Sequence, residues 1–501
     1  MAAPVVTLKG VGGLEFDLPT GLFINNEFVP SVEGLTLDVE NPATGETLTT
    51  IASAGVEDVN KAVAAAQAAF PGWRATPPLE KSKLLWKLAE LFEKPENKQI
   101  FQSIDVLDVG APAAMVDFTL PQCIDNLRYY GGWADKITGK TLHVPGGRAY
   151  TVREPIGVCA GIVPWNTPLM IAVWKLAPAL ATGNVLILKM PELAPLCGLR
   201  FAQLVKEAGF PPGVVNIIAG EGRVAGQALA EHMDIRKVSF TGGGVTGRKI
   251  LRAAADSNMK KVTLELGGKG PTIVFDDAQF ENALFWAFMG FTMHNGQVCV
   301  AGTRIYVQEG IYDRFIEAFR EKLAASSKSS KVQGASGAEG AGKSPVISKL
   351  QHEKIMAYIE SGTKEGATLL GGGNKIGDKG YFVEETAFVD VNPDAKIMKE
   401  EIFGPVASIA KFKTEDEVIA AANNSVYGLN AAIFSGNPDR IRKVSDALEV
   451  GTVTVNYWGA LNMNTPFGGV KESGFGRDMG EEALDGWTHV KTVKQLSLPT
   501  A

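Results

Sequence analysis

The chain has 501 residues, of which 45% are hydrophobic and 21% charged, an ordinary globular balance. A single hydrophobic core stops growing near roughly 250–300 residues, so we expect two or three domains. The formal net charge of −6 argues against a nucleic-acid partner and against binding to an anionic membrane surface.

The N-terminus and the cysteines bear on location. The start, Met1-Ala2-Ala3-Pro4, lacks the basic and apolar regions of a secretory signal. The apolar stretches near 156–165 and 176–188 are interrupted by polar residues, Gly or Pro, so neither reaches the ~20 residues of a membrane-spanning helix. Four cysteines without close pairing are typical of free thiols in a reducing compartment. These features predict a cytoplasmic protein with no membrane partner.

Apolar spacing predicts helices and short buried strands in alternation. The chain begins with helices over 57–70 and over 79–92, the second behind Pro77-Pro78. The elements that follow are a strand at 185–188, a helix at 197–208 and strands at 214–218 and 238–241. After residue 267 the rhythm restarts with strands at 272–275 and 303–307 and a helix at 313–323. Such alternation favours parallel strands joined by crossover helices, an α/β fold with a second domain beginning near residue 267.

Two other segments have a distinct composition. Residues 324–343 are dominated by Ser, Gly, Ala and Lys, so we expect a mobile surface loop there. The tail at 487–496 alternates Thr, Val and Lys, which predicts a strand. A terminal strand needs a partner edge, and another subunit can supply one.

A glycine-rich motif follows the expected strand at 238–241. Residues Gly242-Gly243-Gly244-Val245-Thr246-Gly247 match G-x-G-x-x-G and precede an expected helix at 248–255. Glycines let the backbone approach a pyrophosphate, and a helix N-terminus supplies oriented N–H groups. Glu265 lies near the offset of a ribose-binding acid. The alternative is a tight turn between strand and helix.

Cys299, in the segment Asn295-Gly296-Gln297-Val298-Cys299, is a candidate nucleophile. The alternative is a cysteine that only packs, because cysteine is among the most buried residue types. His294 lies too close in sequence to indicate a positioned Cys–His protease pair. We expect no metal site, since no zinc-binding or EF-hand spacing is present.

Several segments taken together resemble the aldehyde dehydrogenase superfamily, in particular its large non-acylating branch. They occur in the family's order and extend from about residue 20 to 495. The matching segments are Pro164-Trp165-Asn166, Gly183-Asn184 through Lys189 and Glu192, Phe240-Thr241-Gly242, Glu265-Leu266-Gly267-Gly268-Lys269, Gly296-Gln297-Val298-Cys299, Glu400-Glu401-Ile402-Phe403-Gly404-Pro405 and Pro466-Phe467-Gly468-Gly469.

The resemblance implies a catalytic set. Cys299 would attack the aldehyde, with the side-chain amide of Asn166 and the Cys299 backbone N–H stabilising the oxyanion. Hydride transfer to NAD would leave a thioester. Glu265 would then act as the general base for hydrolysis, in place of the ribose-binding role that the glycine motif alone assigns to it.

The resemblance also implies a cofactor site for NAD, with NADP as an alternative. The residues expected there are Ile162, Trp165, Lys189, Glu192, Gly242, Gly243, Gly247, Glu401 and Phe403. Lys189 and Glu192 would contact the adenosine ribose. Gly243 and Gly244 stand where the family often has Ser and Thr, so a hydroxyl near the pyrophosphate is missing.

The substrate site is expected beside Asn166, where relatives often have an aromatic residue after the asparagine and this chain has Thr167. The residues expected to line it are Thr167, Met170, Trp174, Met293 and Phe467. Such a wide, mostly apolar wall favours medium-chain or aromatic aldehydes.

The expected fold is therefore aldehyde dehydrogenase-like. It comprises a Rossmann-type cofactor domain (20–139 and 154–266), an α/β catalytic domain (267–478) and a small β extension for oligomerisation (140–153 and 479–501). The extension would pair residues 140–153 with the terminal strand 488–496, in a homodimer or homotetramer, although a hairpin folded back within one subunit is the alternative. Two functional rivals remain, an acyl-CoA-forming relative and a non-enzymatic binding protein that keeps the fold.

Overall fold

The computed structural model describes residues 4–329 and 343–496. Its first large sheet has eight strands, and the five central ones run parallel. In spatial order the strands are β25 (Gly474–Phe475), β13 (Lys261–Glu265), β12 (Lys237–Thr241), β9 (Val158–Ile162), β10 (Val185–Met190), β11 (Val215–Ala219), β3 (Leu22–Ile24) and β4 (Glu27–Val29). The predicted strands at 185–188, 214–218 and 238–241 correspond to β10, β11 and β12, which confirms the α/β class.

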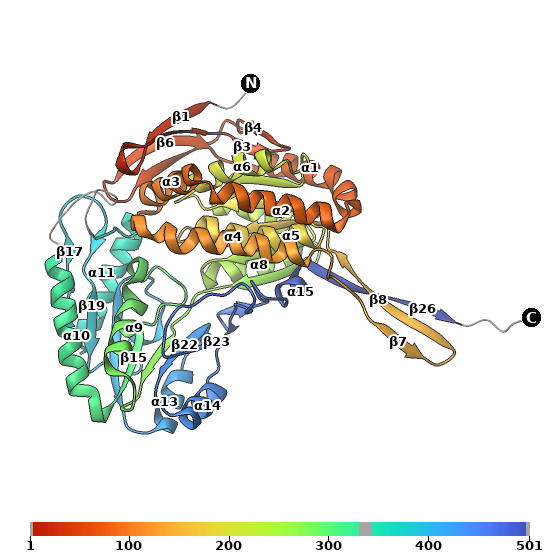
Figure 1. The fold of residues 1–501 in the computed structure, drawn as a ribbon. Coiled ribbons are helices and arrows are strands. Elements are labelled where there is room, and N and C mark those ends of the chain that lie inside the picture. Colours follow the sequence, from red (N-terminus) through yellow and green to blue (C-terminus); the bar gives the residue numbers. More distant parts are fainter. Residues whose placement is uncertain (1–3, 330–342, 497–501) are drawn as a thin grey trace, which may run out of the picture.

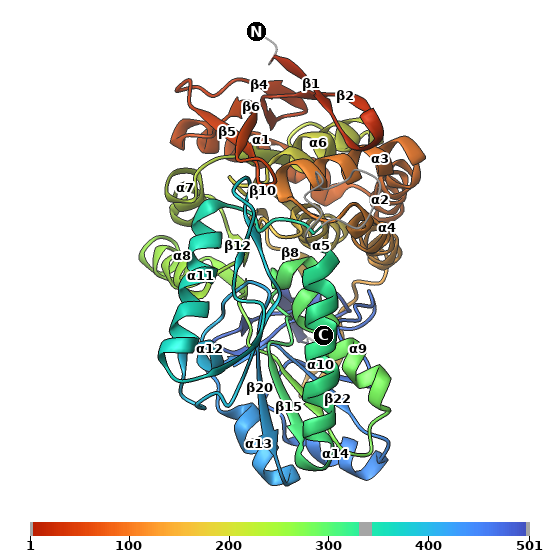
Figure 2. The ribbon, with the colours of Figure 1, turned by 90° about the vertical axis from the view of Figure 1, so that its left-hand side faces the viewer.

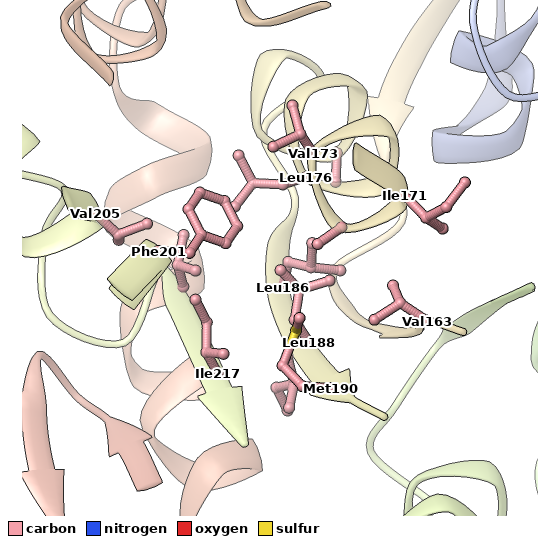
Figure 3. Packing of buried hydrophobic residues seen from close by; sticks show 14 of the residues in the cluster. Val163, Ile171, Val173, Leu176, Leu186, Leu188, Met190, Phe201, Val205 and Ile217 are labelled. Atoms are coloured by element: carbon pink, nitrogen blue, oxygen red, sulfur yellow. The ribbon is translucent and has the colours of Figure 1, made fainter. Parts of the chain in front are cut away.

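The core of this sheet explains why its strands are apolar throughout. Every residue of β10 and β11 is buried, because helices cover both faces of the sheet. All residues of helix α5 (Pro168–Ala181) are buried as well. Figure 3 shows side chains of α5, β10, β11 and helix α6 (Leu196–Ala208) packed together in this layer.

Several other helices cover this sheet or flank it (Figure 1). They are α1 (Val56–Ala75), α2 (Pro78–Glu93), α3 (Pro95–Ile104), α4 (Val116–Trp133) and α8 (Gly244–Asp256). The predicted helix at 79–92 is confirmed as α2, which begins at Pro78. Proline is suited to that first position because the N–H it lacks would have no partner within the helix.

The second large sheet has seven strands, and all neighbours except one pair run parallel. In spatial order they are β16 (Thr368–Gly371), β19 (Thr386–Val389), β20 (Val406–Phe412), β15 (Arg304–Gln308), β14 (Pro271–Val274), β22 (Asn430–Phe434) and β23 (Thr452–Val455). Figure 2 shows α9 (Phe280–Thr292) and α10 (Glu309–Ser329) on one side of it and α11 (Lys349–Lys364) on the other. Neighbouring residues alternate between these layers, since Val274 packs with α9 and α10 whereas Ile273 packs with α11.

Three strands form an arm that extends away from the body (Figure 1). They are β7 (Thr141–Val144), β8 (Gly147–Pro155) and β26 (Thr488–Leu496). β26 pairs antiparallel with β8 from Thr488 opposite Pro155 to Leu496 opposite Gly147. Residues 147–153 of the predicted segment 140–153 therefore pair with residues 490–496 within one chain.

One prediction needs correction and another lies partly outside the described residues. Residues 324–329 were expected to be loop, but α10 continues to Ser329. Ala, Ser and Lys are compatible with a helix, and Leu323 anchors this end of α10 in the core. The rest of the expected loop, apart from Lys343, falls outside the described residues. Among the described helices, none combines the length and the apolar character that crossing a membrane requires.

Candidate active site

A cavity lies where the carboxyl ends of parallel strands meet the segment around Cys299. It has a volume of about 240 Å³. Asn166 follows β9, Gly242 follows β12 and Glu265 ends β13, so the sheet brings all three to one edge. Asn166, Glu265 and Cys299 all line this cavity, which we call the inner cavity. The three predicted catalytic residues are therefore brought together.

A strained turn presents Cys299. His294, Asn295 and Gly296 have φ values of 50°, 55° and 66°, a left-handed run that side chains other than glycine rarely adopt. The side-chain amide of Asn295 donates to the carbonyls of Ser344 and Pro345, at 2.8 and 3.0 Å. These bonds attach the turn to the segment at 344–347, which was not anticipated from the sequence.

The surroundings of Cys299 both oppose and support a thiolate. Burial raises the pKa of the Cys299 thiol to about 12, and Glu401 and Glu265 add to the rise. The backbone N–H groups of Cys299 and Val300 act in the opposite direction and lower the pKa of the thiol. The side-chain amide of Asn166 donates to the carbonyl of Gln297 at 2.9 Å, which holds it beside this turn.

Glu265 is a buried carboxyl group, 6% exposed, whose Oε2 has no hydrogen-bond partner among the described residues. Burial raises the pKa of Glu265 well above its ordinary value, and the charge of Asp478 raises it further. Lys175 and Arg477 lower that pKa. Glu265 is therefore poised to exchange a proton with a reactant in the inner cavity.

Lys175 and Asp478 form a buried pair near Glu265. The Lys175 ammonium lies 3.4 Å from the Asp478 carboxylate and donates to Ser239 Oγ at 3.1 Å. Lys175 belongs to α5, whereas Asp478 lies far along the chain, beyond β25. No periodicity or spacing in the sequence indicates this pair, whose two charges shift the pKa of Glu265 in opposite directions.

The residues expected at the cofactor site fall into two groups. Trp165, Gly242, Gly243, Glu401 and Phe403 line the inner cavity. Ile162, Lys189, Glu192 and Gly247 do not.

Lys189 lies opposite Ile162 in the sheet, at the carboxyl end of β10. Its ammonium donates to Glu192 Oε2 at 2.9 Å, and Glu192 Oε1 accepts from the Gly222 N–H at 3.3 Å. The two residues that were predicted to contact the adenosine ribose therefore bond each other at the carboxyl end of β10, outside the inner cavity.

The glycine motif is only partly a loop. Helix α8 was expected to begin at Arg248 but begins at Gly244, with Gly243 as its N-cap. Gly247 therefore lies inside the helix, where a Cβ would come within 2.9 Å of the Leu266 side chain. A Cβ on Gly243 would meet nothing within 4 Å, so the backbone there is open to a ligand.

Glu401 and Phe403 form another part of the wall of the inner cavity. Glu401 Oε1 accepts from the Gly268 N–H at 3.0 Å, and burial raises the pKa of the Glu401 carboxyl. Phe403 has a φ of 58° and contacts Trp165 edge to face, with ring centroids 5.2 Å apart. Gln351 of α11 donates to the Phe403 carbonyl at 2.8 Å and holds this strained residue in place.

All the predicted substrate residues line the inner cavity, and several more were missed. Thr167, Met170, Trp174, Met293 and Phe467 are present as expected. The lining residues that sequence reasoning missed are Met115, Phe118, Gln351, Lys354, Trp458 and Leu461. They come from α4 and the residue before it, from α11 and from the segment after β23, none of which carries a recognised motif. Among the described residues no cluster of His, Cys, Asp and Glu has the makings of a metal site.

Comparisons with known proteins agree with this geometry. The model of the aldehyde dehydrogenase family matches residues 28–493. An aldehyde dehydrogenase of Davidiella tassiana is 51% identical over 481 residues, 96% of each chain. One of Alternaria alternata is 50% identical over 482 residues, again 96% of each chain.

Solved structures give the same result. The NAD+ complex of a Bacillus cereus aldehyde dehydrogenase has a TM-score of 0.92 and 42% identity, covering 95% of this chain and 96% of that one. A mutant of the indole-3-acetaldehyde dehydrogenase of P. syringae, solved with NAD+ and IAA, has a TM-score of 0.92 and 36% identity. The match covers 96% of this chain and 97% of that one. The chain therefore belongs to the aldehyde dehydrogenase family, and it is an aldehyde-oxidising oxidoreductase.

Proposed function

We propose that this enzyme oxidises aldehydes with NAD through a covalent thioester on Cys299, which water activated by Glu265 hydrolyses. The observation that carries the proposal is that Cys299, Glu265 and Asn166 line one cavity, with Glu265 Oε2 buried and unpartnered among the described residues. A carboxyl group in that state lacks a structural partner and suits proton transfer to a reactant.

The residues present fit a dinucleotide. Gly243 leaves open space at the N-terminus of α8, a helix of 13 residues whose first N–H groups favour a phosphate. Glu192 has a carboxylate held by Lys189 and Gly222, suited to accept bonds from ribose hydroxyls. Glu401, which lines the inner cavity, is a second buried acceptor. The NAD+ complex of the Bacillus cereus relative supports this choice.

The first step makes a carbon–sulfur bond. The Cys299 thiolate attacks the carbonyl carbon, and an electron pair moves to the carbonyl oxygen. The amide of Asn166 and the backbone N–H of Cys299 are the donors we assign to that oxyanion. Bound NAD supplies the acceptor for the hydride that leaves this carbon.

The second step breaks the same bond. Glu265 takes a proton from a water molecule whose oxygen attacks the thioester carbon, and the Cys299 thiolate leaves as the carboxylic acid forms. Lys175 and Asp478 set how readily Glu265 ionises. Hydrolysis by this base distinguishes the proposal from the acyl-CoA-forming alternative.

The lining of the inner cavity supports a substrate preference. Its walls around Met170, Trp174 and Phe467 are apolar, so medium-chain or aromatic aldehydes are the proposed substrates. Each added methylene contributes about 0.8 kcal/mol of binding, close to fourfold in kcat/KM. We expect kcat/KM to rise from acetaldehyde to hexanal.

We also propose a homodimer or homotetramer held by the arm. Its strands β7, β8 and β26 extend from the body (Figure 1). They carry exposed apolar side chains. These are Leu142, Tyr150, Val152, Val490 and Leu496. The domain division at 20–139 with 154–266, 267–478 and 140–153 with 479–501 remains a proposal. Sheet membership supports it except at β25 (474–475), which belongs to the first sheet although it falls within 267–478. A cytoplasmic location is also proposed, and four free cysteines support it.

Two variants test the mechanism. Cys299→Ala should abolish NADH formation while NAD binding persists, because the nucleophile alone is lost. Glu265→Gln should give a burst of about one NADH per active site and then turn over roughly 10²–10⁴-fold more slowly. Cys159→Ala is the matched control, since Cys159 is buried in β9 and outside the inner cavity.

Three outcomes would contradict the mechanism. Turnover that survives in Cys299→Ala excludes the thioester. If Glu265→Gln binds NAD more weakly but keeps a normal steady-state rate, Glu265 binds the cofactor ribose and is not the base. Acceleration of the slow phase of wild-type enzyme by coenzyme A, with an acyl-CoA product, establishes the acyl-transfer alternative instead.

A further inference from the structure

A buried histidine lies in the strained turn that presents Cys299, and the proposed mechanism does not use it. His294 is 3% exposed and has a φ of 50°. Among the described residues, neither of its ring nitrogens makes a hydrogen bond of regular geometry. A buried polar group without such a bond is costly, so a histidine at this place needs a physical explanation.

The ring of His294 is neutral and faces the backbone of Asn166. Burial lowers the pKa of His294 to about 4, so at neutral pH one ring nitrogen is a donor and the other an acceptor. The backbone of Asn166 acts in the opposite direction and raises that pKa. Only an acceptor stabilises a charged imidazole in this way, so the Asn166 carbonyl lies at a ring nitrogen. Such contacts are often poorly aligned before substrate binds and tighten in the reacting complex.

Gln297, the residue after the strained turn, holds the side chain of Asn166. The Asn166 amide donates to the carbonyl of Gln297 at 2.9 Å. Gln297 is itself fixed, because its backbone N–H and its side-chain amide both donate to the carbonyl of His294, at 3.1 and 3.3 Å. An amide nitrogen carries two hydrogens, so the second N–H of Asn166 is left for an oxyanion. The direction of that N–H depends on where the backbone of Asn166 is held.

We propose that His294 is a positioning residue for the oxyanion donor. Its neutral ring donates to the Asn166 carbonyl while the Gln297 carbonyl holds the side-chain amide, so Asn166 is attached at both ends. The turn that presents the nucleophile thereby also directs the free N–H of Asn166. An error of about 1 Å in such a position can cost roughly a hundredfold in rate. The inference rests on the proposed function, since it assumes that Asn166 stabilises the oxyanion.

A double-mutant cycle tests whether His294 acts through Asn166. His294→Gly removes the ring, and glycine adopts positive φ without strain. The quantity to compare is kcat/KM for the aldehyde at saturating NAD, because it reports the steps up to thioester formation. We expect His294→Gly to lower it roughly tenfold to hundredfold in otherwise wild-type enzyme. In an Asn166→Ala background the loss should be less than about threefold, since the group that His294 positions is already gone.

Two further variants accompany the cycle. His294→Asn also tolerates positive φ and keeps a polar side chain in part of the space of the ring, so it should show the same pattern with a smaller loss. It takes the place of His294→Gly in the cycle if the glycine variant yields too few folded sites, as counted by NAD binding. Asp390→Gly is the matched control, since Asp390 has a φ of 54°, is exposed and lies outside the inner cavity. It should leave kcat/KM unchanged in both backgrounds.

The outcomes separate this inference from the proposed function. Equal losses in the two backgrounds show that the histidine supports the turn independently of Asn166, and they overturn the inference while the proposed function stands. Full activity of both His294 variants overturns it as well. An Asn166→Ala enzyme with unchanged kcat/KM contradicts the proposed oxyanion donor, and the inference fails with it. Wild-type enzyme that oxidises no aldehyde contradicts the proposed function itself.

Discussion

Removing either charge of the Lys175–Asp478 pair should shift the pH dependence of thioester hydrolysis, and the two removals should shift it in opposite directions. Both side chains are buried, with a separation of 3.4 Å between ammonium and carboxylate. Asp478 raises the pKa of Glu265, and Lys175 lowers it. The changes to make are Asp478→Asn and Lys175→Met, which remove one charge each at similar volume.

The direction in which each variant shifts the pH dependence follows from the role of Glu265 as a base. Only the ionised carboxylate accepts a proton from water, so hydrolysis accelerates as pH rises through the pKa of Glu265. Asp478→Asn lowers that pKa and moves the rise to lower pH. Lys175→Met raises it and moves the rise to higher pH. A unit charge acting through an effective dielectric of about 20 shifts a nearby carboxyl group by roughly one to two pKa units.

The assay is the steady-state rate after the NADH burst, measured against pH under conditions where hydrolysis limits turnover. Burst amplitude counts the folded active sites, which matters because breaking a buried ion pair costs roughly 3–5 kcal/mol. Glu472→Gln is the control, since it removes a carboxylate from an exposed ion pair with Arg248. Shifts in the same direction, or no shift in either variant, would refute the electrostatic account of Glu265.

Three further changes test individual contacts. Glu192→Gln should narrow the preference for NAD over NADP, because it removes a negative charge that repels a 2′-phosphate; wild-type kcat/KM favouring NADP would contradict this assignment. Thr167→Phe should reduce activity on bulky aldehydes more than on acetaldehyde, and equal losses would show that Thr167 does not set the width of the inner cavity. Asn295→Ala should lower the thermal midpoint and reduce kcat more than it changes KM, because the buried carbonyls of Ser344 and Pro345 lose their donor at about 1–3 kcal/mol each. An unchanged kcat would show that the turn at 294–296 does not contribute to catalysis.

The β-α alternation could be predicted because buried parallel strands leave a local signal. The run at 185–190 is apolar and short, and it forms β10. Helix ends were less predictable. Gly243 and Gly244 indicate a loop by composition, yet α8 begins at Gly244. A glycine can occupy the first helical position, and the motif only requires that no side chain cover the N-terminus of the helix. Residues 324–329 include Ala and Lys, which favour helix, and packing of the preceding turn extends α10 through them.

Some residues of the candidate site could likewise be predicted from local motifs, and others could not. Asn166, Glu265 and Cys299 could be found because each belongs to a motif of adjacent residues. The Lys175–Asp478 pair could not, since its members are 303 positions apart and neither belongs to a local pattern. The bonds from Asn295 to 344–345 cross a gap of about 50 positions and were equally invisible. Contacts between distant segments depend on the assembled fold, which one sequence does not reveal.

The structure explains why the motifs that were recognised in the sequence contain glycines. A Cβ on Gly267 would lie 2.2 Å from Glu401 Oε2, and one on Gly268 would lie 2.3 Å from the carbonyl oxygen of Cys299. One on Gly468 would lie 2.7 Å from the carboxylate of the proposed base. Each of these distances is shorter than van der Waals contact allows. The glycines therefore let the segments that carry the base, the nucleophile and the second buried carboxylate approach each other closely, with Gly267 and Gly468 against carboxylates and Gly268 against a backbone carbonyl.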